Sequence, residues 1–192
     1  VTEPAPAHSA AEGAASLAET VGRCVPGLMT ETGCPGLVVR VERRGHVLLE
    51  RAWGWADVAG RRPMEAGAVF RAGSISKAVT AIGVVRLSEM GVIGLDEPAE
   101  HSVRSWRFTP EVAGGFDTRG VTIRRVLSHT AGLNSGRAVF VPEGTALPGA
   151  AAILAGRVQG HPKLMLESEP ATGVRYTGMR YTLMQCLVED VT

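Results

Sequence analysis

The sequence predicts an α+β fold, and three stretches carry that prediction. Residues 37–42 and 47–56 are rich in β-branched and aromatic residues and flank the turn dipeptide Arg44-Gly45, which is typical of a β-hairpin. Residues 78–90 are apolar around most of the helical circumference, which indicates a helix in the middle of a protein. Residues 181–192 carry apolar side chains at helical spacing. We therefore expect an N-terminal hairpin followed by a mostly helical region.

Length and composition limit the domain count and the class of partner. A chain of 192 residues with 45% hydrophobic and 20% charged residues is typical of one globular domain. The net charge of +1 favours neither a nucleic acid nor a membrane surface as partner, and no window is apolar enough to span a membrane. Residues 1–9 are predicted to form a disordered tail, and 10–192 the folded domain.

The first residues and the cysteines indicate the compartment. The N-terminus lacks the basic start and apolar run of a signal peptide, so we expect a cytoplasmic protein, with an exported mature chain as the alternative. The three cysteines have no metal-like spacing, and no metal site is expected. They are interpreted as free thiols, with a Cys24–Cys34 disulfide as the alternative.

Further helices are predicted around the hairpin and the central helix. Residues 10–24 have a helical pattern, and Pro26 predicts a kink or a restart. Gly91 is expected to end the central helix at the C′ position. Thr122 is a plausible N-cap for a helix over 123–128, and a further helix is expected over 146–158.

Ser74 and Lys77 are the first candidates for chemistry. They lie three residues apart and would share one face of a helix. A serine hydroxyl needs a neighbouring base to become a nucleophile, and a desolvated lysine can lose its proton and serve as one, whereas arginine stays charged. The chain holds only two lysines, Lys77 and Lys163. The alternative is a capped helix with a surface lysine. The S-x-x-K pattern itself is a mark of serine β-lactamases and penicillin-binding proteins.

The order of motifs along the chain resembles one family, the serine hydrolases related to class C β-lactamases, DD-carboxypeptidases and β-lactamase-like esterases. The resemblance covers about 36–192, most of the chain. The motifs that carry it are Pro35-Gly36, Gly54-x-Ala56-Asp57, Phe70-Arg71-x-Gly73-Ser74-x-Ser76-Lys77, Gly94-Leu95-Asp96-x-Pro98, Val121-Thr122-Ile123-Arg124-x-Val126-Leu127-x-His129-Thr130-x-Gly132-Leu133, and a last block that runs from Glu169-Pro170-x-x-Gly173 through Tyr176-Thr177-Gly178 to Tyr181-x-Leu183.

The resemblance implies a role for each matching residue. Ser74 would be the acylated nucleophile, and its backbone N–H one donor to the oxyanion. Lys77 would be the general base, and Tyr176 would shuttle a proton between nucleophile and leaving group. Gly178 would lie at the substrate-binding third position of the family's Y-x-N motif. Tyr181 is expected to pack in its helix rather than replace Tyr176.

Two departures from the family pattern limit the expectation. Gly178 replaces an asparagine amide, which argues against efficient turnover of β-lactams or peptides. The third motif, K-T-G or H-x-G, does not occur in the chain. His129-Thr130-Ala131 belongs to an earlier helix and would not replace it, and we expect His129 to be structural rather than catalytic.

The absent motif also has a consequence for the fold. The resemblance implies a β-lactamase/transpeptidase-like fold in which the C-terminal strands of the sheet are absent from this chain, so that 10–192 is a single partial domain. The hairpin edge and one side of the Ser74 helix would then be uncovered. We expect a fragment, one half of a split enzyme, or a homo-oligomer.

The function expected from the resemblance is that of a serine hydrolase acting through an acyl-Ser74 intermediate. Its substrate would be a small ester, amide or β-lactam, and it would use no cofactor. A C-terminal partner chain is a possible requirement. The alternative is a catalytically impaired or non-catalytic relative that only binds a ligand or a partner.

Overall fold

The structure is a computed structural model that describes residues 10–136, 141 and 144–192. The chain divides into two compact units at Arg71 and Ala72, called here the N-terminal unit and the C-terminal unit. Each is described by itself. The tail predicted over residues 1–9 lies outside the described residues, and one partial domain over 10–192 stays a prediction.

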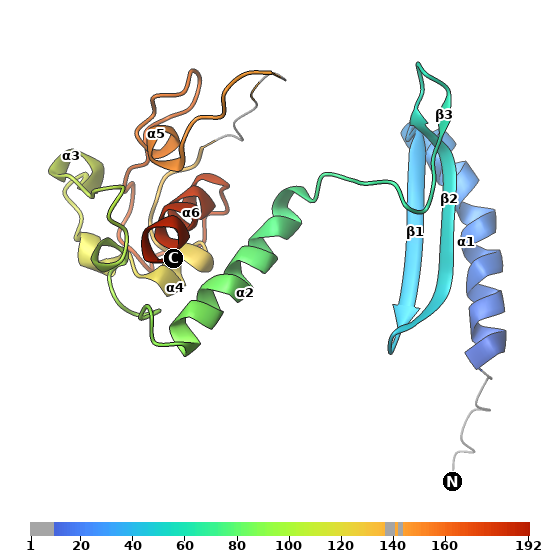
Figure 1. Ribbon diagram of the computed structural model, residues 1–192, viewed down its shortest axis with the longest axis horizontal. Coiled ribbons are helices and arrows are strands. Elements are labelled where there is room, and N and C mark those ends of the chain that lie inside the picture. Colours follow the sequence, from blue (N-terminus) through green and yellow to red (C-terminus); the bar gives the residue numbers. More distant parts are fainter. Residues whose placement is uncertain (1–9, 137–140, 142–143) are drawn as a thin grey trace, which may run out of the picture. The chain divides into compact units, whose positions relative to one another are not determined.

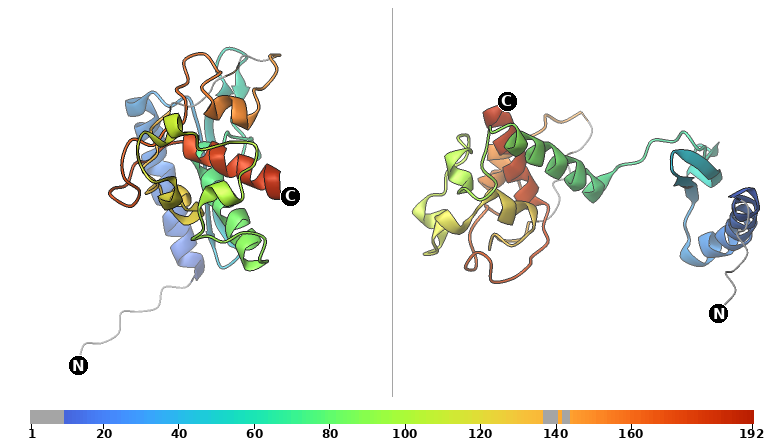
Figure 2. Two further views of the ribbon diagram at one scale, coloured as in Figure 1. Left: turned by 90° about the vertical axis from the view of Figure 1, so that its left-hand side faces the viewer. Right: turned by 90° about the horizontal axis from the view of Figure 1, so that it is seen from below.

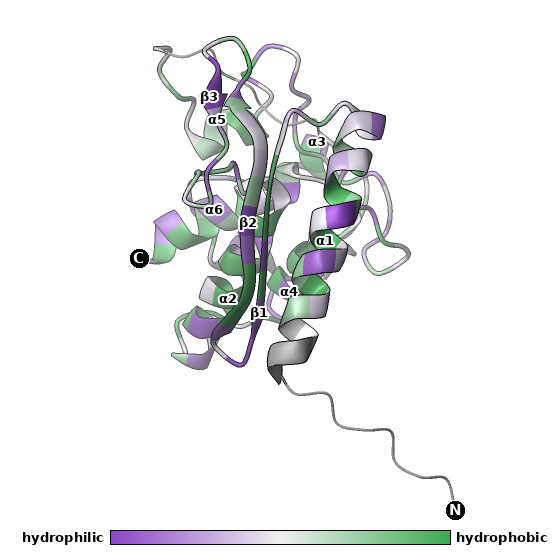
Figure 3. Cartoon of the chain, turned by 90° about the vertical axis from the view of Figure 1, so that its right-hand side faces the viewer, coloured by the Kyte–Doolittle hydropathy of each residue, from purple (hydrophilic) through white to green (hydrophobic). Residues whose placement is uncertain are grey.

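The N-terminal unit begins with the helix α1, Ala10–Thr32. The expected restart at Pro26 is wrong, because α1 continues through that residue to Thr32, and the alternative of a kink stays a prediction. A proline removes one backbone donor from a helix. In the turns that follow Pro26, the side-chain hydroxyls of Thr30 and Thr32 donate to the carbonyls of Pro26 and Leu28, four residues earlier. In Figure 3, α1 carries both hydrophobic and hydrophilic residues along its length.

The predicted hairpin is confirmed. Strands β1, Gly36–Arg43, and β2, His46–Asp57, pair antiparallel, and β2 also pairs with the two-residue strand β3, Arg62–Pro63. The strand order is β1-β2-β3. Arg44 and Gly45 both have positive φ, 50° and 80°, which is the backbone that a two-residue hairpin turn requires.

Helix α1 lies along this sheet and packs on β2 (Figure 1; Figure 2). Val25 from the helix and Leu49 from β2 are buried. The junction between helix and sheet is tight at Gly54, where φ is +71° and an added Cβ would lie 2.2 Å from the Pro35 carbonyl oxygen. Only glycine fits such a backbone approach without strain.

The C-terminal unit begins with a short 3₁₀ helix, η1, Gly73–Ile75, which leads into α2, Ser76–Glu89. Gly91 ends α2 with φ +74°, and the Val92 N–H donates to the Leu87 carbonyl, so the predicted C′ glycine is confirmed. The apolar residues of α2 differ in burial. Val84 is the buried residue of α2, whereas the side chains of Val79 and Ile82 are 67% and 71% exposed.

The remaining elements of the C-terminal unit are short, except for the last helix. They are η2 (Ala99–His101), α3 (Pro110–Ala113), η3 (Thr118–Gly120), α4 (Ile123–Leu127), α5 (Ala150–Leu154) and α6 (Met179–Val191). The predicted N-cap of α4 is confirmed, because the Thr122 hydroxyl accepts from the Arg125 N–H at 3.3 Å. The helix expected over 146–158 is shorter, because Gly149 precedes α5 and Gly156, at φ +68°, follows it.

A single hydrophobic core holds the C-terminal unit together. It draws on α4, α5, α6 and the segments between them, and Val84 brings α2 into it. Leu183, Met184 and Leu187 of α6 are fully buried, which fits the helical spacing of apolar residues predicted for this segment. Helices α4 and α6 lie side by side in Figure 1 and pack against one another. This core positions the segment that leads into α6.

The structure also tests the expected free thiols and the expected absence of a membrane span. Cys24, Cys34 and Cys186 are all free, so the disulfide alternative is wrong and free thiols are confirmed. Among the described residues, no helix is both long and apolar enough to cross a bilayer. The cytoplasmic location stays a prediction.

Candidate active site

Ser74 and Lys77 lie where η1 passes into α2. The Ile75 N–H donates to the Ala72 carbonyl and closes the 3₁₀ turn, so Ser74 stands one turn before Lys77 on the same side of the helix. The Lys77 ammonium donates to Ser74 Oγ at 3.0 Å. Ser74 is exposed and Lys77 is half-buried. The i, i+3 contact expected from the sequence is therefore formed.

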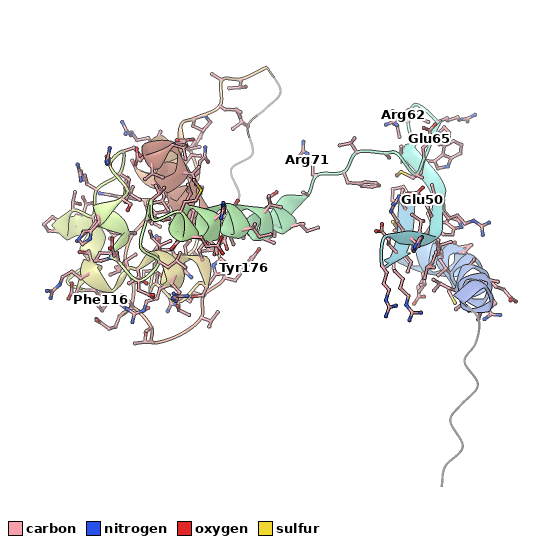
Figure 4. The ribbon with its side chains drawn as sticks, turned by 60° about the horizontal axis from the view of Figure 1, so that its bottom comes forward. Glu50, Arg62, Glu65, Arg71, Phe116 and Tyr176 are labelled. Carbon is pink, nitrogen blue, oxygen red and sulfur yellow. The ribbon has the colours of Figure 1, made fainter. Side chains whose placement is uncertain are left out.

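Tyr176 comes to Ser74 from the segment before α6, a hundred residues further along the chain. Its hydroxyl is hydrogen-bonded to Ser74 Oγ at 2.5 Å, and Lys77 Nζ lies 4.9 Å from the centre of its ring. Figure 4 shows Tyr176 beside α2. The side chain is 60% exposed. The structure thus brings the three predicted catalytic residues into one hydrogen-bonded group.

The Tyr176 segment is held by contacts to the residues that follow α4. On one side of Tyr176, the Arg175 N–H donates to the His129 carbonyl at 2.9 Å. On the other side, the buried Thr177 hydroxyl accepts from the Gly136 N–H at 3.1 Å. These bonds place the backbone of Tyr176, although most of its ring is in solvent.

The electrostatics of the group favour ionisation of the phenol. The pKa of Tyr176 is lowered, first by its hydrogen bond to Ser74 and then by hydrogen bonding to Lys77 and by the positive charge of Lys77. Both effects stabilise the phenolate form. The site therefore holds a hydroxyl nucleophile next to an ammonium and an acidified phenol.

Two further aromatic side chains border the group. The His129 ring lies 4.7 Å from the Tyr176 ring and 5.6 Å from the Tyr181 ring. The pKa of His129 is lowered by burial and by the charges of Arg180 and Lys77, which favours the neutral imidazole. Tyr181 donates its hydroxyl to the Leu127 carbonyl at 3.1 Å, so it packs within the unit, as the sequence analysis expected.

Gly178 lies two residues after Tyr176, at the N-cap of α6. Its φ is −71°, a value open to any residue, and no heavy atom lies within 4 Å of an added Cβ. The backbone therefore does not require glycine here. Its substrate-binding role stays a prediction.

Sequence reasoning missed Arg180, which follows Tyr176 by four residues and is fully buried. It lies three and seven residues before Leu183 and Leu187 and so shares their apolar face of α6. A charged residue on the buried face of a predicted helix was the signal that could have identified it. Among the described residues, no group of three or more His, Cys, Asp or Glu side chains could hold a metal ion.

Comparisons with known proteins identify the family and the fold of the chain. The chain matches the Beta-lactamase family over residues 21–192. Esterase EstB of Burkholderia gladioli is 38% identical over 122 residues, which cover 62% of this chain and 30% of the esterase. The chain thus spans less than a third of that relative's length.

Solved structures show the same fold. EstCE1, a hydrolase with promiscuous acyltransferase activity, superposes with a TM-score of 0.72 at 28% identity, covering 93% of this chain and 48% of EstCE1. The octameric penicillin-binding protein homologue from Pyrococcus abyssi superposes with a TM-score of 0.70 at 22% identity, covering 90% of this chain and 39% of that protein. The predicted β-lactamase-like fold is therefore confirmed. With the family match extending over most of its length, the chain belongs to the Beta-lactamase family of serine hydrolases.

Proposed function

We propose that this chain carries the acylating half of a serine hydrolase site, in which Ser74 attacks a carbonyl and becomes acylated. The observation that supports this most directly is the pair of hydrogen bonds on Ser74 Oγ, from Lys77 at 3.0 Å and with Tyr176 at 2.5 Å. A hydroxyl between two proton-transfer groups has the geometry that nucleophilic catalysis requires.

Two proton routes are compatible with these contacts. In the route expected from the sequence, a neutral Lys77 takes the Ser74 proton as the general base and Tyr176 passes a proton to the leaving group. In the second route, an ionised Tyr176 takes the proton while Lys77 stays charged and stabilises the phenolate. The pKa of Tyr176 is lowered by its hydrogen bonds to Ser74 and Lys77, which is compatible with the second route. In both routes, Ser74 Oγ bonds to the carbonyl carbon and the leaving group departs with one proton.

The proposed substrate is a small ester, amide or β-lactam. The similarity to an esterase and to a hydrolase with acyltransferase activity supports an ester or another activated acyl group first. Gly178 offers no side-chain amide to a substrate amide, which also favours esters over peptides and β-lactams. No step of this scheme needs a metal or an organic cofactor.

The proposal includes a requirement for a further segment or partner. The chain covers 30% of the esterase and 48% of EstCE1, and its sequence holds no K-T-G or H-x-G motif for the far wall of the site. The exposed apolar residues Val79 and Ile82 on α2 fit a surface that another segment covers. We propose that this cover is a C-terminal part, or else a second copy of the chain.

Covalent labelling of Ser74 tests the proposal. A fluorophosphonate should form one adduct, which peptide mass spectrometry places on Ser74 and which Ser74→Ala abolishes. Ser76→Ala is the matched control, because this exposed serine lies one residue before Lys77, and it should keep the adduct. A folded wild-type protein without an adduct, also after addition of a C-terminal part of a relative, would leave the alternative that the chain only binds a ligand or partner.

A further inference from the structure

Among the residues that the structure describes, Arg180 is a buried cation without an acidic partner. It lies in the first turn of α6 and has no exposed side-chain surface. None of the ion pairs formed by the described residues includes it. Burial lowers the pKa of Arg180 to about 10, assisted by the charge of Arg175, and the guanidinium remains charged at neutral pH. A buried unpaired charge is costly to a fold, so its position calls for an explanation.

The guanidinium donates hydrogen bonds to three backbone carbonyls. Nη1 donates to the His129 carbonyl at 2.8 Å and also to the Arg175 carbonyl. Nη2 donates to the Leu133 carbonyl, and Nε has no partner among the described residues. Hydrogen bonds from a charged donor are stronger than those from a neutral one. Arg180 therefore links two segments far apart in the sequence, the one after α4 and the one before α6.

These carbonyls lie next to the contacts of Tyr176. Arg175 precedes Tyr176 directly, and its own N–H donates to the same His129 carbonyl that Arg180 binds. The His129 ring in turn packs against the Tyr176 ring at 4.7 Å. Because φ of His129 is +62°, its backbone is in the left-handed region, which is unfavourable for a non-glycine residue. Two donors on its carbonyl hold it there.

The Tyr176 ring itself has little packing to hold it. It is 60% exposed, so its 2.5 Å contact with Ser74 depends on where the backbone of the segment lies. We propose that Arg180 is a positioning residue that holds Tyr176 on Ser74 by binding the carbonyls of His129, Leu133 and Arg175. This inference rests on the proposed function, because it assigns Arg180 to the proton-transfer group of that site.

The chain offers a direct readout, because Tyr176 and Tyr181 are its only two tyrosines. The pKa of Tyr176 is lowered by Ser74 and Lys77, whereas burial raises that of Tyr181. In the folded protein Tyr176 should therefore ionise at a lower pH than Tyr181, and Tyr176→Phe should remove the part of the tyrosinate absorbance that rises first with pH, called here the lower step. Among the described residues, the charged and titratable groups around Tyr176 are Lys77 from α2, His129 after α4, the preceding Arg175, and Arg180 and Tyr181 from α6.

Two substitutions separate positioning from charge. Arg180→Met removes the charge and the donors. Arg180→Lys keeps the charge but places all its donors on one nitrogen, without the planar fork by which Nη1 and Nη2 bind separate carbonyls. If Arg180 acts by positioning, both should move the lower step up toward about 10, the value of a free tyrosine, and both should slow fluorophosphonate labelling of Ser74 about tenfold or more. Arg119→Met is the matched control, because Arg119 is exposed and paired with Asp117, and it should leave both steps unchanged.

The outcomes of these titrations distinguish positioning by Arg180 from an effect of its charge alone. A low step that Arg180→Lys keeps and Arg180→Met loses would show that only the charge matters and overturn positioning. A low step kept by both folded variants would make Arg180 merely structural. If Arg180→Met does not fold, Arg180→Lys decides alone. A wild-type protein without a low step that depends on Tyr176 would instead count against the proton role of Tyr176 in the proposed function.

Discussion

The core of the C-terminal unit and the Ser74 site come from the same helices but differ in burial. Val84 of α2 is fully buried, whereas Ile82, two residues earlier, is 71% exposed, and Ser74 is exposed before the first turn. Likewise Leu183 of α6 is fully buried, while Tyr176 just before that helix is 60% exposed. The contrast indicates that buried residues of α2 and α6 stabilise the unit, whereas exposed residues at the starts of these helices form the reactive group. Arg180 and His129 link the core to that group.

The largest loss of reactivity without a loss of stability is expected for a substitution of Lys77. Lys77→Arg keeps the positive charge but removes the only side chain at the site that can become a neutral amine base, since arginine does not deprotonate. We expect labelling of Ser74 by a fluorophosphonate to slow about 10³-fold, with an unchanged melting temperature because Lys77 contributes little to the core. Lys163→Arg, at the other lysine, is the control. A loss within a few-fold would shift the base role to the Tyr176 phenolate.

In the core, a substitution is expected to lower stability without lowering the reactivity of Ser74. Leu183→Ala should lower the free energy of unfolding by about 3 kcal/mol, because a fully buried leucine leaves a cavity. The labelling rate per folded molecule should stay within a few-fold of the wild type. Leu147→Ala is the matched control, because Leu147 is 82% exposed, and it should cost less than about 0.5 kcal/mol. Denaturant unfolding and labelling in parallel measure both. Equal losses at the two leucines would contradict the division between core and surface.

Gly178 is predicted to lie at the substrate site, and the surrounding residues leave space for a side chain there. Gly178→Asn should fold as well as the wild type, with a change of about 0.5 kcal/mol or less, because its φ and the open space around it accept a side chain. An added amide at this position should strengthen reaction with a fluorescent penicillin more than with an ester. Gly132→Asn is the contrasting variant: an added Cβ would meet the Ser168 carbonyl oxygen at 2.1 Å, and the protein should be destabilised. An unchanged preference between the two reagents would remove Gly178 from the substrate site.

The smallest effect is expected at His129 and depends on pH. Its folded pKa lies below its ordinary value of about 6.5, so the unfolded chain binds a proton more readily than the folded one. The stability gained from a neutral His129 is thus present above about pH 6.5 and is lost as the pH falls toward the folded pKa. His129→Asn, which tolerates the left-handed backbone, should lose less stability between pH 7 and pH 5 than the wild type. Melting temperatures at both values measure this, with the exposed His101→Asn as control; equal losses in wild type and His129→Asn would contradict it.

Local patterns predicted the elements where a single residue decides the backbone. Arg44-Gly45 at the hairpin turn, Gly91 at the end of α2 and Thr122 at the start of α4 act through their own conformational or hydrogen-bonding preferences, and the structure bears each out. A restart of the helix at Pro26 and the length of the helix over 146–158 were misjudged. Loss of one donor did not stop α1, and the glycines on both sides of α5 limited that helix although alanine favours it.

The sequence by itself determined the pair Ser74 and Lys77, because their spacing along a helix brings them together whatever surrounds them. Tyr176 could be named only through a family resemblance, because its contact with Ser74 spans 102 residues. Tertiary structure alone decided how that contact is held. The buried guanidinium of Arg180 joins carbonyls from two distant segments, and backbone carbonyls carry no residue identity from which a sequence pattern could have predicted the link.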